Sequence, residues 1–302
     1  MPTYSEIRRQ ELKHIEQSLK DDRKMKRELA KIYNSSLDDI QRHIDADIHR
    51  FAHKEGVSMA EAKRIISKTD VEAFQSTAKR YVEEKNFTPQ ANKELRRYNV
   101  TMRSNRLELL QARINIDTVM LAWEEEQLTA KYITEEVIKE HIRQASILGM
   151  TVPSRSQLET LAKSVLLSDV SGATFSDRIW ANQNELRNNI NQTIERALIR
   201  GEHPRKATAS IKRLVRDDYG KAKRAADRIA ITEVARSQHI SMTLALKEAG
   251  IDEYIWIAEN DSCPDCAELD GKIFDVDETE YTVPRHPFVV APQPLTLSSC
   301  GA

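Results

Sequence analysis

The sequence predicts a mainly α-helical protein, with long N-terminal helices and a helical C-terminal domain closed by a small Cys-bearing β-hairpin unit. Glycine and proline are scarce, 8 and 9 in 302 residues, which favours long helices over a many-turned β architecture. Apolar residues recur at helical spacing as far as Gly250, and β-forming residues follow it. Hydrophobic residues make up 40% and charged residues 31%, so we expect a modest core beneath a highly charged surface.

The N-terminal segment carries two apolar stripes typical of amphipathic helices. Leu12, Ile15 and Leu19 are three and four residues apart, and a second stripe with the same spacing extends from Leu37 to Phe51. Between the stripes, Lys20 to Glu28 is nearly all charged. This stretch is either a solvated helix or a hinge.

Further helices are marked by the residues that begin them. Capping boxes begin at Ser58 and Thr69, and Thr88 precedes a proline at a first helical position. Periodicity then predicts one helix from about 92 to 131 and another from Thr134 to Gly149.

Met150 to Pro153 is the clearest break in the chain, so we divide the chain into a helical N-terminal region, 1–150, and a C-terminal domain, 151–287. A capping box at Ser156 to Glu159 begins the second part. Three more helices are expected. The first contains Trp180 and ends near residue 201, the second begins at Pro204, and the third covers 228–249.

After these helices the pattern changes to that of a β-hairpin. Tyr254 to Ala258 is rich in β-formers, and Lys272 to Phe274 is a candidate partner strand. Asp270-Gly271 suits a type I′ turn immediately before it.

Composition excludes some classes of protein. No apolar run could span a bilayer, and the N-terminus lacks the apolar region of a signal peptide, so we expect no membrane association. Three cysteines cannot form a disulfide framework.

Charge is unevenly distributed although the net charge is only -1. Arg178 to Arg228 holds 13 Lys/Arg and 6 Asp/Glu, a balance of +7, whereas Ile251 to Glu280 holds 1 Lys and 11 Asp/Glu, a balance of -10. This split fits docking between opposite charges or contact of the basic segment with nucleic acid; the alternative is two solvated faces.

Five blocks in the C-terminal part occur together in a characteristic order. They are Arg228 to Arg236 with its Thr232-Glu233 pair, Trp256, Asp261 to Cys266, Leu269 to Phe274 with Asp270-Gly271, and Pro284 to Pro287. In this order and spacing the chain resembles the Mu F-like family of phage head morphogenesis proteins, also called minor head or minor capsid proteins. The N-terminal helices resemble the family only in character.

The resemblance implies a non-enzymatic, low-copy component inside the head of a tailed phage. Such a protein is made in the host cytoplasm and acts in head assembly or DNA delivery. The implied partners are the portal protein, with scaffold and major capsid proteins and non-sequence-specific DNA as further candidates.

Within the first block, Thr232, Glu233 and Arg236 lie three and four residues apart and can form one polar cluster on a helix face. The family pattern suggests that the cluster ties its helix to the Cys-bearing hairpin. An ordinary surface ion pair is the alternative.

Cys263 and Cys266 have the spacing of metal ligands, and His286 is a third candidate for a zinc site. In the family the His-Pro pair leads, through one residue, to Cys-Arg-Cys, which would complete four thiolates, but this chain lacks it. Without it the site is one ligand short. Cys300, in the tail, is a further candidate for the fourth ligand. The alternative is two free thiols in a turn.

The missing cysteines have a candidate explanation in the codons. One inserted T lets the codons for Phe288-Val-Val-Ala-Pro read Phe-Cys-Arg-Cys-Ser. We therefore interpret 288–302 as an out-of-frame or disordered tail. Sequencing the two valine codons tests this hypothesis.

Two other functions are alternatives. A metal-dependent HNH-like nuclease also combines C-x-x-C with a downstream histidine, but His286 lacks the preceding Asp and a second His or Asn that would hold the metal. A generic helical DNA-binding protein would not need the Cys-bearing hairpin.

Overall fold

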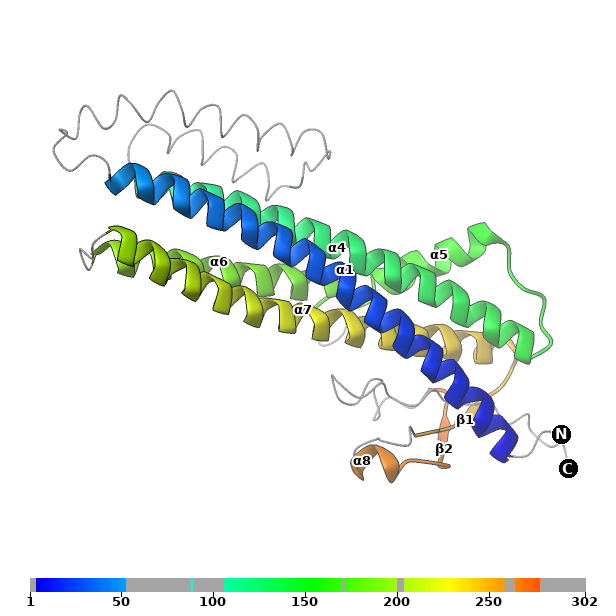
Figure 1. Cartoon of the computed structure of the whole chain (residues 1–302). Coiled ribbons are helices and arrows are strands. Elements are labelled where there is room, and N and C mark those ends of the chain that lie inside the picture. The colour runs from blue at the N-terminus through cyan, green and yellow to red at the C-terminus, as the bar shows by residue number, and fades with distance from the viewer. Residues whose placement is uncertain are drawn as a thin grey trace, which may run out of the picture. The chain divides into compact units, whose positions relative to one another are not determined.

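The computed structural model describes residues 4–52, 88, 106–169, 172–199, 204–258 and 264–277 (Figure 1). It contains the helices α1 (Tyr4–Ala52), α4 (Arg106–Ile147), α5 (Arg155–Leu166), α6 (Phe175–Ile199), α7 (Pro204–Glu248) and α8 (Pro264–Ala267), and the strands β1 (Glu253–Ile255) and β2 (Ile273–Asp275). The predicted mainly α-helical class is confirmed. The helix starts predicted at 58, at 69 and after 88 lie outside the described residues.

α1 is one continuous helix through the charged stretch 20–28, so the hinge alternative is wrong. The reason is that the buried face continues across it: Ile15, Met25 and Leu29 are all buried. The charged residues occupy the other faces of the same helix, as expected for an amphipathic surface helix.

Two predicted breaks between helices are absent. α4 continues through Thr134, whose hydroxyl donates to the Ala130 carbonyl oxygen at 2.8 Å instead of capping a new helix. Inside a helix, a threonine hydroxyl can donate to the backbone carbonyl oxygen four residues earlier in this way. α7 likewise continues from Pro204 through Arg228 to Glu248.

α5 begins two residues earlier than predicted. Its N-cap is Ser154, whose side chain and that of Gln157 form the capping box, with the Ser154 amide donating to Gln157 Oε1 at 2.9 Å. Ser156 lies inside the helix, where its carbonyl oxygen accepts from Thr160. The predicted break at 150–153 is confirmed as a segment without regular structure.

The chain forms two compact units, each assembled from separate segments. Unit 1 comprises 1–28, 127–178 and 227–302, and unit 2 comprises 29–126 and 179–226. Because each unit takes residues from both sides of residue 150, the predicted division there stays a prediction.

Within the described residues of unit 2, four helix segments surround one apolar core. The four helix segments of α1, α4, α6 and α7 all contribute to it (Figure 1). The buried core residues are Tyr33, Ile40, Ile44, Leu110, Ile114, Leu121, Leu186, Ile190, Ile194, Ile211, Val215, Tyr219, Ala222 and Ala226. From Ala112 to Ala122, α4 is buried at every position.

A polar layer crosses the unit 2 core. The Tyr33 hydroxyl donates to Glu125 Oε2 at 2.8 Å and accepts from Gln183 Nε2 at 2.6 Å. All three side chains are buried. Since buried polar groups are costly without partners, this layer restricts how the helices pack.

Unit 1 holds the N-terminal part of α1, the C-terminal parts of α4 and α7, α5 and the hairpin elements. α4 and α7 are joined by buried hydrogen bonds, from Gln238 Nε2 to Glu136 Oε2 at 2.8 Å and from Ser241 Oγ to the Val137 carbonyl oxygen at 2.9 Å. Among the described helices, none is long and apolar enough to cross a bilayer.

The two strands pair antiparallel, with Tyr254 opposite Phe274. The connection between the strands contains α8. The turn predicted at Asp270-Gly271 is present after α8, closed by a 3.0 Å hydrogen bond from the Lys272 amide to the Leu269 carbonyl oxygen. Gly271 has φ 78, a conformation that favours glycine.

Candidate functional site

A buried carboxylate, Glu233, lies at the centre of the polar cluster that the sequence predicts on α7. Glu233 of α7 is 1% exposed and accepts from Arg236 Nε at 3.0 Å and Arg236 Nη2 at 2.6 Å. It also pairs with Arg178 at the start of α6. Arg236 donates further to Ser168 Oγ, just beyond α5, at 3.2 Å. The surface-pair alternative is therefore wrong for Glu233.

The contacts of this cluster run to the α5–α6 corner. The family pattern suggests a tie to the hairpin, whereas Glu233 and Arg236 contact Arg178 and Ser168. Thr232 does not join the cluster, since its buried hydroxyl has no hydrogen-bond partner among the described residues. Arg178 and Ser168 were missed because no sequence spacing links them to Glu233.

Trp256 anchors the hairpin to unit 1. It is fully buried and packs with Met242 and Leu246 of α7, while its ring lies 5.8 Å from that of Phe274. The Trp256 amide donates to the Lys272 carbonyl oxygen at 2.8 Å. The hydrophobic contacts thus hold the hairpin on the C-terminal end of α7.

Asp270 connects this hairpin to the N-terminal helix. Its Oδ1 accepts from the Ala258 amide at 2.7 Å, and its Oδ2 lies 3.6 Å from an Arg8 Nη2. Arg8 also donates to the Ala258 carbonyl oxygen at 3.2 Å. Asp270 therefore links the hairpin to α1 in addition to its place in the turn.

Arg228, which belongs to the same predicted structural motif, is exposed.

The candidate zinc ligands are only partly described. Cys266 lies in α8 and has no exposed surface. Cys263, His286 and Asp261 lie outside the described residues, as does the tail beyond 287. Among the described residues no group of three potential ligands occurs. Zinc binding therefore stays a prediction.

A second buried ionic cluster, between α1 and α4, was not predicted. Arg143 pairs with both Glu11 and Glu140, which are each 1% exposed, and His14 Nε2 lies 3.4 Å from Glu140 Oε2. Burial would raise the pKa of Glu140, but His14 and Arg143 lower it to about 2. Glu11 shares the face of Ile15, four residues away, which is the one signal that its side chain would be buried.

Asp22, also on α1, has a raised pKa. Burial raises the pKa of Asp22 from 3.8 to about 7; Lys26 opposes the shift, and Glu136 and Asp21 add to it. Asp22 is therefore a protonatable group within unit 1.

Comparison with known proteins finds a family match in the C-terminal part of the chain. Residues 188–289 match the family model described as Phage Mu protein F like protein. Because of this similarity we call residues 188–289 the Mu F-like segment. The match agrees with the family that the sequence blocks indicate, and it covers Glu233, Arg236, Trp256 and Asp270. No curated protein and no solved structure shows significant similarity to the chain.

The Mu F-like segment covers only part of the structural arrangement. It includes all of α7 and the hairpin, whereas Arg178, Ser168 and Arg8, which contact it, precede it. It ends at residue 289, next to Phe288, after which the frame change is predicted. The frame change itself stays a prediction.

Proposed function

We propose that this protein is a minor head protein of a tailed phage that acts in head morphogenesis by binding other components. The observation that carries the proposal is the Mu F-like match over residues 188–289, a family of phage head morphogenesis proteins.

The contacts of the matched segment support a binding role. Its most buried charged group, Glu233, is held by Arg236 and Arg178 in paired guanidinium contacts. Such pairing fixes helices rather than leaving a carboxylate poised for proton transfer. These contacts therefore favour a rigid segment that binds partners through its surface.

The partners that we propose are the portal protein first, then scaffold and major capsid proteins, inside the head. The mixed charge of the surface fits assembly by electrostatic complementarity, because +7 and -10 segments occur in one chain. Binding to DNA would be independent of its sequence.

Quantitative mass spectrometry of purified, DNA-filled heads tests the proposal. We expect this chain at a few to some tens of copies per head, together with crosslinks to the portal protein. Empty assembly intermediates from the same lysate are the control, since they show whether the chain enters before packaging. Absence of the chain from both heads and intermediates would refute the proposal.

A further inference from the structure

The exposed face of α1 within unit 1 is strongly basic. Between residues 5 and 28 the exposed side chains comprise six cations and two carboxylates, a balance of +4. The exposed cations are Arg9, Lys13, Lys20, Arg23, Lys24 and Arg27. Of the two carboxylates, Glu16 lies 3.4 Å from Lys20. We call this surface the α1 basic face.

The sequence conceals this surface because several acidic residues of the same helix turn inward. Glu11 is buried and is paired with Arg143, and Asp21 lies 3.4 Å from Lys139 of α4. Carboxylates thus neutralise cations of α4, while the cations of α1 remain toward solvent.

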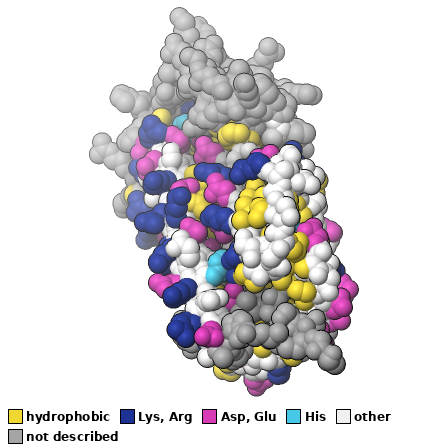
Figure 2. Space-filling model, turned by 90° about the vertical axis from the view of Figure 1, so that its right-hand side faces the viewer, with side chains coloured by type: hydrophobic (Ala, Val, Ile, Leu, Met, Phe, Trp, Pro, Cys, Tyr) yellow, Lys and Arg dark blue, Asp and Glu magenta, His cyan; other side chains and the backbone are white. Residues whose placement is uncertain are grey.

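The cations are spaced to form a continuous row. Arg9, Lys13, Lys20, Lys24 and Arg27 follow one another at intervals of four, seven, four and three residues, so they return to one side of the helix. From the first to the last, 18 residues at 1.5 Å each give about 27 Å. Figure 2 shows Lys and Arg side chains on the left of the view, with Asp and Glu side chains interspersed among them, and apolar side chains mainly on the right.

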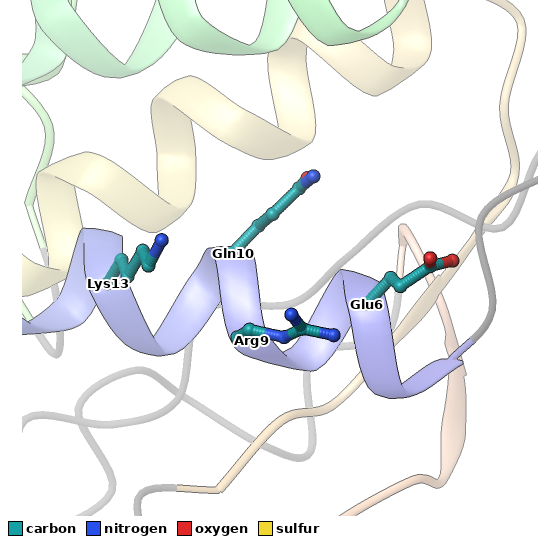
Figure 3. A pocket seen from close by; sticks show the side chains of 4 residues that line it. All are labelled: Glu6, Arg9, Gln10 and Lys13. Atoms are coloured by element: carbon teal, nitrogen blue, oxygen red, sulfur yellow. The ribbon is translucent and has the colours of Figure 1, made fainter.

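A shallow hollow of about 380 Å³ lies at the N-terminal end of the row. Glu6, Arg9, Gln10 and Lys13 line it. Figure 3 shows the four side chains on successive turns of α1, with the Arg9 guanidinium lying along the helix toward Glu6. The hollow thus presents amide and cationic donors beside one another.

We propose that the α1 basic face binds the phosphate backbone of duplex DNA without reading its sequence. The inference rests on the proposed role within a DNA-filled head, and it assigns the DNA contact to α1 instead of the basic segment 178–228. Every exposed side chain on this face between 5 and 28 is Ser, Gln, Glu, Lys or Arg. A protein partner would require apolar or aromatic side chains at the centre of its interface, whereas phosphate contacts require only cations and polar donors.

The test compares two triple variants of the full chain by fluorescence anisotropy with a labelled 30-base-pair duplex of mixed sequence. The first variant neutralises three exposed cations of the α1 basic face, Lys13→Gln, Lys20→Gln and Lys24→Gln. The matched control neutralises three exposed cations of α7, Arg213→Gln, Arg216→Gln and Arg224→Gln. Circular dichroism confirms that both remain helical, as expected for exposed positions.

Each neutralised phosphate contact contributes about 0.9 to the slope of log K against log salt, so the α1 variant should lose about 2.7 of that slope. If affinities converge at 1 M salt, this corresponds to an approximately 500-fold loss at 0.1 M. The α7 variant should change by less than about threefold.

Three results would overturn the proposal. They are no binding of the wild-type chain in 50 mM salt, an equal or greater loss in the α7 variant, and tighter binding of poly-L-glutamate than of DNA, which would indicate an acidic protein partner. Incorporation of the α1 variant into heads is measured separately. Normal incorporation with lost DNA affinity leaves the head protein assignment intact, so the two proposals fail independently.

Discussion

Removing the carboxylate of Glu233 should destabilise the protein more than any other single charge change in its Mu F-like segment. Glu233 is 1% exposed and is shared by Arg178 and Arg236, whose side chains are 29% and 12% exposed. Breaking a fully buried ion pair costs about 3–5 kcal/mol. Because Arg178 is partly hydrated after the change, we expect Glu233→Ala to lower the free energy of unfolding by about 2–4 kcal/mol.

The assay is urea denaturation followed by circular dichroism, with Glu185→Ala as the matched control on an exposed glutamate of α6. The control should change stability by less than about 0.5 kcal/mol. Glu233→Gln keeps the volume and one acceptor, so it should lose roughly half as much as Glu233→Ala. A loss below about 1 kcal/mol for Glu233→Ala would show that the cluster is not stabilising and that the reasoning from burial is wrong.

Three further predictions follow from single side chains. Because burial raises the pKa of Asp22 to about 7, the folded state loses stability as pH rises from about 4 to 7. Asp22→Asn should therefore raise the free energy of unfolding by about 1–2 kcal/mol at pH 8 and leave it unchanged at pH 3, as measured by thermal unfolding across pH. Tyr33→Phe removes the hydroxyl between Glu125 and Gln183 and should cost about 1–3 kcal/mol in urea unfolding, and an unchanged midpoint would contradict the polar layer. Gly271→Ala forces a side chain into φ 78 and should cost about 1–2 kcal/mol, whereas Lys272→Ala beside it should be neutral.

The sequence predicts the helical class well because the spacing of its apolar residues indicates which face of each helix is buried. The stripe of α1 that includes Ile15 continues to Met25 and Leu29, so the helix does not end where the charges begin. Helix ends are less predictable, because the same side chain can cap a helix or bond within one. Thr134 bonds within α4, and Ser154 rather than Ser156 caps α5.

The candidate site is predictable where its residues are neighbours on one helix. Glu233 and Arg236 are three apart, and their pairing follows from that spacing. Arg178 and Arg143 are different, because each meets its carboxylate partner on another helix. Such contacts depend on how helices pack, and a single sequence contains no record of that packing.

The burial of α4 at every position from Ala112 to Ala122 has a consequence for how this protein tolerates change. An amphipathic helix such as α5 buries Leu158, Ala162 and Val165 and leaves the positions between them freer. A saturation mutagenesis map would therefore show a period near 3.6 residues along α5 and an unbroken block of intolerance along this part of α4. Variation among natural relatives should be filtered in the same way, leaving α4 as the slowest-changing stretch outside the Mu F-like segment.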